Sequence, residues 1–313
     1  MNKILFVHNN YSIQGGEDTV VEIEAKELSK NFEVEIIYFQ NRIEKSNVIK
    51  IPFSSINPYS AIVFIKKLIK FKPDIVYFHN LWFSASPILI LVSKLFGKIN
   101  VVKLHNYRTT CLNDIHYLNK KTCIKCLDST KANGVINKCY RNSRILSFFK
   151  LLHVLTLNFL LKKSVDRIII FTKFHENILL KKGFSKKLLY RQQNNVPVSI
   201  NTFSQPRNDY LYVGREEEYK GIDDLINLWL KIPYFKDKKL NLLGKFENYE
   251  QYINYENINF LGQVSSKEVR KYMTKSKAVI FPSKLFEGNP MVIKEAISTN
   301  TIVISSNLGG IPE

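Results

Sequence analysis

Two glutamates near the end of the sequence have the type and spacing of a sugar-binding pair. Glu287 and Glu295 stand eight residues apart in "LFEGNPMVIKEAIS". Gly288 and Asn289 follow the first glutamate, and Asn289 as N-cap before Pro290 predicts that a helix begins at Pro290. Both carboxylates would then lie at a junction of strand and helix. There Glu295 could accept charge-assisted hydrogen bonds from two sugar hydroxyls, each contributing about 1.5 to 3 kcal/mol.

Two cations form a second candidate site in "VGREEEYKG". Arg215 and Lys220 follow an apolar run and are bracketed by Gly214 and Gly221. Arginine and lysine on a glycine-bearing loop are suited to holding a diphosphate. A solvated, charged turn is the alternative interpretation of the same residues.

A glycine pair and a histidine complete the candidate ligand-binding residues. Gly15 and Gly16 come after the run at 3–7, and their amides together with a helix N-terminus would suit an anion. The G-x-G-x-x-G spacing is missing, which disfavours a dinucleotide-dependent dehydrogenase. His105 directly follows the run at 99–104, where its imidazole could hydrogen-bond a substrate or serve only the structure.

All four cysteines fall in one segment, 111–139, with the spacing C-x11-C-x2-C-x12-C. The apolar run at the start of the chain is too short for a secretory signal, so we expect a cytosolic protein with reduced thiols. The spacing then favours a closed, structural zinc site of four thiolates over four unligated thiols. The expected ligands are Cys111, Cys123, Cys126 and Cys139.

Positive charge is concentrated in the first part of the sequence. The 313 residues carry a net charge of +19, and residues 1–200 hold 31 Lys and Arg against 13 Asp and Glu. Within this part, 144–167 is apolar at helical spacing and basic at both ends. Such a helix either packs on a sheet or lies on an anionic bilayer surface. No uninterrupted apolar run reaches the roughly 18 residues that a membrane span needs.

Short β-branched runs alternate with helix-like segments along the whole sequence, which predicts an α/β fold with parallel sheets. The pattern pauses at 196–209, a proline-bearing stretch that is typical of a linker, and then restarts. We therefore expect two domains facing a cleft, 1–200 with the cysteine loop and 207–313. Ligands of such sheets bind at the carboxyl ends of the strands, which is where the candidate residues fall.

"VGREEEYKG", "LFEGNPMVIKEA" and the ending "SSNLGGIPE", in this order, resemble glycosyltransferase family 4, the retaining nucleotide-sugar transferases of GT-B fold. The resemblance covers essentially the whole chain. It implies that Glu287 contacts the donor sugar, that Glu295 contacts the ribose, and that Arg215 and Lys220 neutralise the diphosphate. It further implies that Gly15 and Gly16 belong to a loop that closes on the phosphates.

The same resemblance places His105 beside the transferred sugar, so that His105 and Glu287 would be catalytic. It implies a Rossmann-like acceptor-side domain and a nucleotide-sugar-binding domain that is C-terminally incomplete. The cysteine loop resembles an insertion found in bacterial surface-polysaccharide members. Asn300 replaces a common glycine of the family, and we expect it to keep the left-handed turn.

The implied activity is transfer of a hexose from a nucleotide-diphosphate sugar to a glycan or lipid-linked acceptor in capsule, O-antigen or exopolysaccharide synthesis. No D-x-D triplet occurs, so catalysis is expected to need no metal ion or other cofactor. We expect a peripheral enzyme on the cytoplasmic face of the cell membrane, with an anionic membrane surface and no nucleic acid among its partners. The alternatives are a zinc-containing nucleic-acid-binding protein, and a glycosyl phosphorylase, for which no cofactor lysine is evident.

Overall fold

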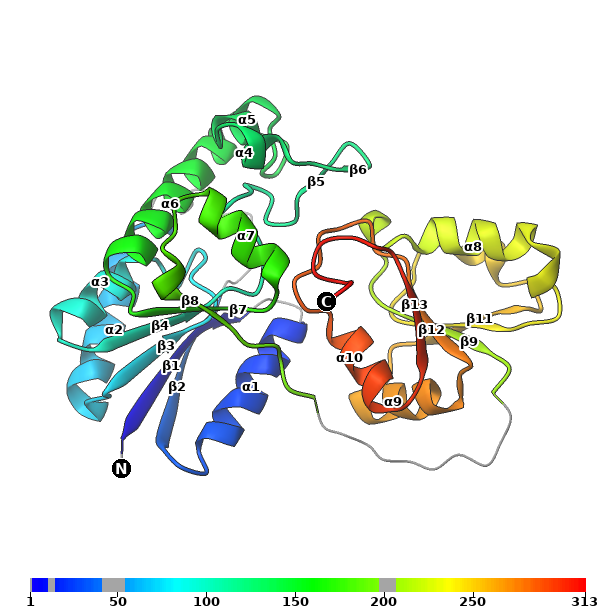
Figure 1. The fold of residues 1–313 in the computed structure, drawn as a ribbon, viewed down its shortest axis with the longest axis horizontal. Helices are drawn as coiled ribbons and strands as arrows, with labels where there is room; N and C mark the ends of the chain where they lie inside the picture. Colours follow the sequence, from blue (N-terminus) through cyan, green and yellow to red (C-terminus); the bar gives the residue numbers. More distant parts are fainter. Residues whose placement is uncertain (1, 11–14, 41–53, 197–206) are drawn as a thin grey trace. The chain divides into compact units, whose positions relative to one another are not determined.

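The structure is a computed structural model of the chain that describes residues 2–10, 15–40, 54–196 and 207–313. The chain divides into two compact units (Figure 1). Unit 1 comprises Met1–His116, Cys123–Asn195 and Glu313, and unit 2 comprises Tyr117–Thr122 and Val196–Pro312. The expected linker at 196–209 falls largely outside the described residues.

Unit 1 is built on a six-stranded parallel sheet with the order β2-β1-β3-β4-β7-β8. Its strands are β1 (Lys3–Asn10), β2 (Glu33–Gln40), β3 (Ile75–Phe78), β4 (Ile99–Lys103), β7 (Arg167–Ile170) and β8 (Leu189–Arg191). Its helices are α1 (Gly16–Leu28), α2 (Pro58–Phe71), α3 (Ile88–Leu95), α4 (Lys125–Asp128), α5 (Ala132–Ile136), α6 (Arg144–Lys163) and α7 (Lys173–Lys181).

Both faces of this sheet are buried, which explains why β1 is a continuous apolar run. Leu5 and Val7 point to the core that α2, α3, α6 and α7 complete. Ile4 and Phe6 point the other way, into the core beneath α1. The strand therefore carries apolar side chains on consecutive residues instead of alternating with polar ones.

Unit 2 repeats the architecture with a five-stranded parallel sheet of order β11-β10-β9-β12-β13. Its elements are β9 (Tyr210–Val213), α8 (Ile222–Lys231), β10 (Leu240–Leu243), β11 (Ile258–Gly262), α9 (Ser266–Lys275), β12 (Ala278–Phe281), α10 (Met291–Ser298) and β13 (Ile302–Ser305). One face packs on α8, and the other packs on α9 and α10. The predicted alternation of strands and helices is confirmed in both units.

The sequence did not indicate a small antiparallel hairpin within the cysteine segment. Strands β5 (Tyr117–Leu118) and β6 (Lys121–Thr122) pair across Asn119 and Lys120, which both have positive φ, 50° and 61°. Positive φ at both central residues is typical of the tight turns that join two strands. Strands of two residues are too short to produce a periodic pattern, so only the structure reveals them.

The turn after α10 follows the expectation for Asn300, whose φ is 52°. Asparagine tolerates the left-handed conformation because its short polar side chain can bond locally. The replacement of the common glycine therefore leaves the link from α10 to β13 intact.

Trp229 of α8 is the central packing residue of unit 2. Its side chain is 1% exposed, stacks on Phe235 with ring centroids 4.1 Å apart, and meets Tyr210 edge-on. Trp229→Ala should lower the free energy of unfolding by about 3 to 5 kcal/mol, because it leaves a large cavity. Chemical denaturation measures the loss, and Leu228→Ala, at a position 55% exposed, is the matched control. Equal losses in the two variants would contradict this packing role.

Candidate functional site

The loop after β12 brings two of the predicted donor-site residues together. Lys220 Nζ donates to Glu287 Oε1 at 2.6 Å, and Ser283 Oγ donates to the same oxygen at 2.7 Å. The two charged side chains are only 17% and 15% exposed. Ser283, which the sequence did not single out, helps to fix the carboxylate.

Glycines allow the chain to approach itself closely around this pair. Gly221 has a φ of 75°, and a Cβ there would lie 2.2 Å from the carbonyl oxygen of Pro282. Gly309 has a φ of 59°, and a Cβ there would lie 3.1 Å from the amide nitrogen of Glu287. Gly310 N donates to the Glu287 carbonyl at 2.9 Å. The glycines at the end of the sequence thus hold the Glu287 loop in place.

Glu295 lies in the second turn of α10 and is half-buried. Burial raises the pKa of its carboxyl group, and the charge of Arg270 opposes the rise. Within the described part of the chain, no hydrogen bond is donated to this carboxylate. A hydroxyl-bearing ligand would supply hydrogen bonds that favour the charged form.

The start of α10 corrects one prediction. The helix begins at Met291 and its N-cap is Pro290, with φ −66° and ψ 118° and no side-chain cap bond, so Asn289 is not the N-cap. Pro290 has extended backbone, because its ψ lies far from helical values. Gly288 and Asn289 therefore belong to the loop that carries Glu287.

The remaining predicted cation of unit 2 is solvent-facing. Arg215 is exposed and follows β9, and its backbone carbonyl accepts a hydrogen bond from Tyr212 OH at 3.3 Å. Its side chain is therefore positioned by a fixed backbone at the carboxyl end of a strand. An exposed guanidinium at such an edge is available to a phosphate.

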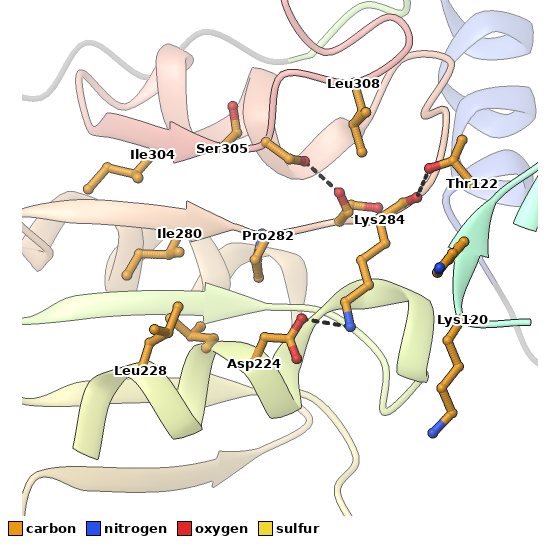
Figure 2. Close-up of a pocket in the computed structure, with 14 residues that line it drawn as sticks. Lys120, Thr122, Asp224, Leu228, Ile280, Pro282, Lys284, Ile304, Ser305 and Leu308 are labelled. Atoms are coloured by element: carbon orange, nitrogen blue, oxygen red, sulfur yellow. Dashed lines mark hydrogen bonds and ion pairs between the residues drawn. The ribbon is translucent and has the colours of Figure 1, made fainter. Parts of the chain in front are cut away.

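A pocket of about 750 Å³ lies in unit 2 (Figure 2), and Ser283 is among the residues that line it. Lys284 borders it, with its Nζ 2.6 Å from Asp224 Oδ2 and its carbonyl accepting from Thr122 Oγ1 of the hairpin at 3.3 Å. Ile280 and Ile304 contribute apolar surface. The predicted donor-site residues do not line this pocket. Its volume therefore does not mark the donor site.

In unit 1, His105 belongs to a chain of buried polar groups. His79, which follows β3, has its Nδ1 2.9 Å from His105 Nε2, and its Nε2 lies 3.9 Å from Glu24 Oε2. Glu24 of α1 also accepts from Tyr77 OH at 3.1 Å and pairs with the fully buried Lys103. No sequence pattern indicates this chain of groups, because its members come from three separate segments.

The electrostatics of the chain keep both imidazoles neutral. Burial lowers the pKa of His79 and of His105 well below the ordinary value, and the nearby Lys103 lowers both further. A carboxylate facing His79 Nε2 favours the proton on that nitrogen. His79 Nδ1 is then an acceptor, and His105 Nε2 donates to it, a proton placement that we assign from the network.

His105 lines a small cavity of about 20 Å³ in unit 1. Asn106 and Arg108 from the same loop, His79, and Leu157 of α6 also border it. With Nε2 donating to His79, the Nδ1 atom of His105 is left as an acceptor. The cavity therefore combines an acceptor nitrogen with an arginine at the carboxyl end of β4.

The glycine pair lies at the N-terminus of α1, as the anion-site interpretation requires, but its first amide is already engaged. Gly15 N donates to Asp18 Oδ2 at 2.7 Å, and the other oxygen of Asp18 lies 2.8 Å from His8 Nε2. Gly16 is the first residue of the helix. Residues 11–14 of the same loop lie outside the described residues.

A buried ion cluster supports the loop that follows His105. Lys150 of α6 is fully buried, and its Nζ lies 3.0 Å from Asp114 Oδ1 and 3.5 Å from the centroid of the Trp82 ring. Asp114 also accepts from Arg108 Nε at 3.2 Å. Burial lowers the pKa of Lys150 to about 7, and the charge of Asp114 opposes this change.

The predicted zinc site is not supported. Across the residues that the structure describes, no three His, Cys, Asp or Glu side chains are grouped so that they could hold a metal ion. Cys111 and Cys126 are buried, and Cys111 Sγ donates to Asn113 Oδ1 at 2.7 Å. Burial raises the pKa of Cys111 to about 12 and that of Cys139 to about 11, so these side chains are packed as neutral thiols. The zinc-containing nucleic-acid-binding alternative loses its supposed ligands with this site.

Residues 198–313 match the sequence model of a family described as "Glycosyl transferases group 1". Over 162 residues the chain is 30% identical to an uncharacterized glycosyltransferase of Methanocaldococcus jannaschii, covering 47% of this chain and 42% of that protein. It is 28% identical over 114 residues to an uncharacterized 41.2 kDa protein in the cps region of Klebsiella pneumoniae, covering 36% of this chain and 31% of that protein. Each match thus spans less than half of the curated relative.

The fold is similar to that of Anabaena HepE, solved in complex with UDP and glucose. The TM-score is 0.63 with 15% sequence identity, over 100% of this chain and 82% of that chain. At this identity the likeness shows the fold alone, which is the pair of Rossmann-like domains of the GT-B class. The family match adds that the second part of the chain carries the pattern of a glycosyl transferases group 1 domain.

The buried Lys150 predicts a specific dependence of stability on pH. Its pKa falls from the ordinary 10.5 to about 7, so between these values the unfolded chain binds more protons and the free energy of unfolding rises with pH. From pH 7 to 9 the wild type should gain about 1 to 2 kcal/mol relative to Lys150→Met, in which no ammonium is buried. Urea denaturation at each pH measures the difference. Parallel curves for the two proteins would show that Lys150 stays charged in the fold.

Proposed function

We propose that the chain is a retaining glycosyltransferase that moves a hexose from a nucleotide-diphosphate sugar to a glycan or lipid-linked acceptor. The observation that carries the proposal is the Lys220–Glu287 pair, with Glu295 on the following helix, inside the segment that matches the glycosyltransferase family. The likeness to a Klebsiella protein of the cps region supports a role in capsule, O-antigen or exopolysaccharide synthesis.

In this proposal each side chain has one task at the donor. Arg215 and Lys220 neutralise the diphosphate, and no metal ion or other cofactor is needed. Glu295 accepts hydrogen bonds from the ribose hydroxyls. Its carboxylate is suited to this task because no hydrogen bond from the described residues occupies it. A diphosphate that attracts Lys220 would draw its ammonium from Glu287, whose carboxylate then contacts the sugar.

The proposed reaction retains the configuration of the anomeric carbon. The bond from this carbon to the diphosphate oxygen breaks, and the acceptor hydroxyl forms the new bond on the side from which the diphosphate leaves. The hydroxyl proton passes to the departing phosphate oxygen. His105 offers its Nδ1 as a hydrogen-bond acceptor beside the sugar, and Arg108 of the same cavity adds positive charge.

Nucleotide binding tests the donor site directly. Among UDP, GDP, ADP and CMP, at least one should raise the melting temperature of the wild type by mass action. Lys220→Ala and Glu295→Ala should each weaken that binding by roughly tenfold or more, because each removes a charge-assisted hydrogen bond. Calorimetry with the selected nucleotide measures the change.

Lys284→Ala is the matched control for Lys220→Ala. It removes a lysine of the same unit that is paired with Asp224 at 2.6 Å and lies at the pocket of Figure 2. Its nucleotide affinity should equal that of the wild type. The donor-site proposal is wrong if no nucleotide binds, or if Lys220→Ala and Glu295→Ala both bind as tightly as the wild type.

His79 should act on the reaction through His105. His79→Ala removes the partner of His105 Nε2, so turnover of the nucleotide sugar should fall about tenfold or more while nucleotide affinity stays unchanged. His79→Asn places an amide oxygen near the former Nδ1 atom and should restore part of the loss. Release of nucleoside diphosphate in steady state gives kcat and KM. A normal kcat in His79→Ala would contradict the positioning role, and so would an equal loss in both variants.

A further inference from the structure

Helix α6 has apolar side chains on its exposed side as well as on its buried side. Its middle turns expose only large apolar side chains: Ile145 at 70%, Phe148 at 48%, Leu152 at 41%, Leu155 at 49% and Phe159 at 63%. Their spacing of three and four residues places them in one stripe along the helix. A helix that packs on a sheet normally turns such a stripe inward.

The buried side of α6 combines leucines of the core with polar residues that have partners inside unit 1. Lys150 pairs with Asp114, as described above. His153 Nδ1 lies 3.3 Å from the carbonyl oxygen of Ser54, and Asn158 Nδ2 donates to the carbonyl of Thr109 at 2.9 Å. These contacts fix the rotation of the helix about its axis. The apolar stripe therefore faces outward as a property of the folded unit.

The helix is 20 residues long, and of the described helices it is the one with the length and apolar composition of a membrane span. Crossing a bilayer would require it to leave the unit and break the contacts of Lys150, His153 and Asn158. Remaining in the unit, it presents its stripe along its side over about 20 Å. This geometry suits a helix that lies in the plane of a membrane surface.

The two neighbouring helices extend the same surface. α2 packs against α3, α3 packs against α6, and all three cover one face of the sheet (Figure 1). On α2, Tyr59 is 74% exposed, and Ile62 and Ile69 are 55% and 58% exposed. At the end of α3, Leu95 is 77% exposed. The apolar surface is therefore shared by a layer of three helices.

The charge of this layer has a single sign. The sequences of α2, α3 and α6 contain no aspartate or glutamate. Their exposed basic residues are Lys66, Lys70, Lys94, Arg144, Lys162 and Lys163. A second copy docking by the same face would oppose these charges to one another, whereas an anionic lipid surface complements them.

We propose that the outward face of α2, α3 and α6 docks unit 1 on an anionic lipid bilayer at the cytoplasmic face of the cell membrane. The apolar stripe of α6 enters the boundary between headgroups and acyl chains, and Arg144, Lys162 and Lys163 contact anionic headgroups at its two ends. The docking surface involves none of the donor-site residues of unit 2.

Docking would also bring the membrane close to the His105 cavity. Leu157, on the buried side of α6, lines that cavity, while Leu155 and Phe159 point outward from the same turns. The two sites are thus separated by about one helix diameter, roughly 10 Å. A lipid-linked acceptor anchored in the bilayer would need to reach only this far, an inference that rests on the proposed function.

Co-sedimentation of the full chain with vesicles tests the docking surface. The protein should bind vesicles of phosphatidylcholine with phosphatidylglycerol at low salt, and it should bind pure phosphatidylcholine weakly. High salt should weaken the binding, because it screens the charges.

Replacing Phe148, Leu155 and Phe159 together with serine should lower binding to anionic vesicles about tenfold or more. Charge reversal by Lys162→Glu with Lys163→Glu should lower it as well.

The matched control replaces exposed apolar residues of unit 2, Ile253 and Tyr255, which are 63% and 45% exposed, with serine. This variant should bind vesicles like the wild type. The triple serine variant should keep the wild-type nucleotide affinity, so failure of membrane docking and failure of the donor site are told apart. The docking proposal is overturned if anionic vesicles are not bound at low salt. It is also overturned if the triple variant and the control bind equally.

A second measurement does not depend on the triple variant folding. Phe159→Trp puts an indole at an exposed position, whereas the two native tryptophans, Trp82 and Trp229, are buried. Its emission should shift to shorter wavelength when anionic vesicles are added, since the ring leaves water. An unchanged spectrum, or self-association of the wild type through α6 in sedimentation without lipid, would reject a lipid partner for this face.

Discussion

Parallel pairing of the strands is the constraint on which the candidate site depends in each unit. All strands of a parallel sheet end at the same edge, so loops distant in sequence meet there. In unit 1 this places His79, after β3, beside His105, after β4, because these two strands are direct neighbours. In unit 2 it places Lys220, after β9, on Glu287, after β12. The candidate site residues are therefore brought together by the pairing of the strands, and not by a motif that contains them all.

Buried charge is the second feature that the two units share, and in each case it is compensated. Lys103 with Glu24 and Lys150 with Asp114 lie beneath the His105 loop, and Lys220 with Glu287 lies in unit 2. A buried charge without a partner lowers the stability of the fold by several kcal/mol. Removing one member of a pair should therefore destabilise the fold, because the other charge stays buried without a partner. Such pairs hold their loops in one arrangement. That rigidity is what a binding site for a charged ligand requires.

The sequence was sufficient for features that depend on local pattern. It identified the alternating strands and helices, the strand-end position of His105 and the left-handed turn at Asn300. It could not identify His79 or Lys103, because their roles depend on partners 26 and 79 residues away that only the folded sheet brings near. The cysteine spacing was misleading for a related reason: spacing shows which ligands a metal could recruit, whereas packing decides whether the thiols converge.

The apolar outer stripe and the partly polar inner face of α6 show how one helix can serve two environments. Hydrophobic burial alone would turn Ile145, Phe148 and Phe159 inward, and the core would gain apolar area. The inner face is shared by leucines of the core and by polar residues, of which Lys150 and Asn158 contact the loop that follows His105. Such an arrangement exposes apolar surface to water, which is unfavourable for a protein that remains in solution. At an anionic bilayer the same surface would become favourable. In the proposed docking, the residues that support the loop after His105 and those that would meet the membrane occupy opposite sides of one helix.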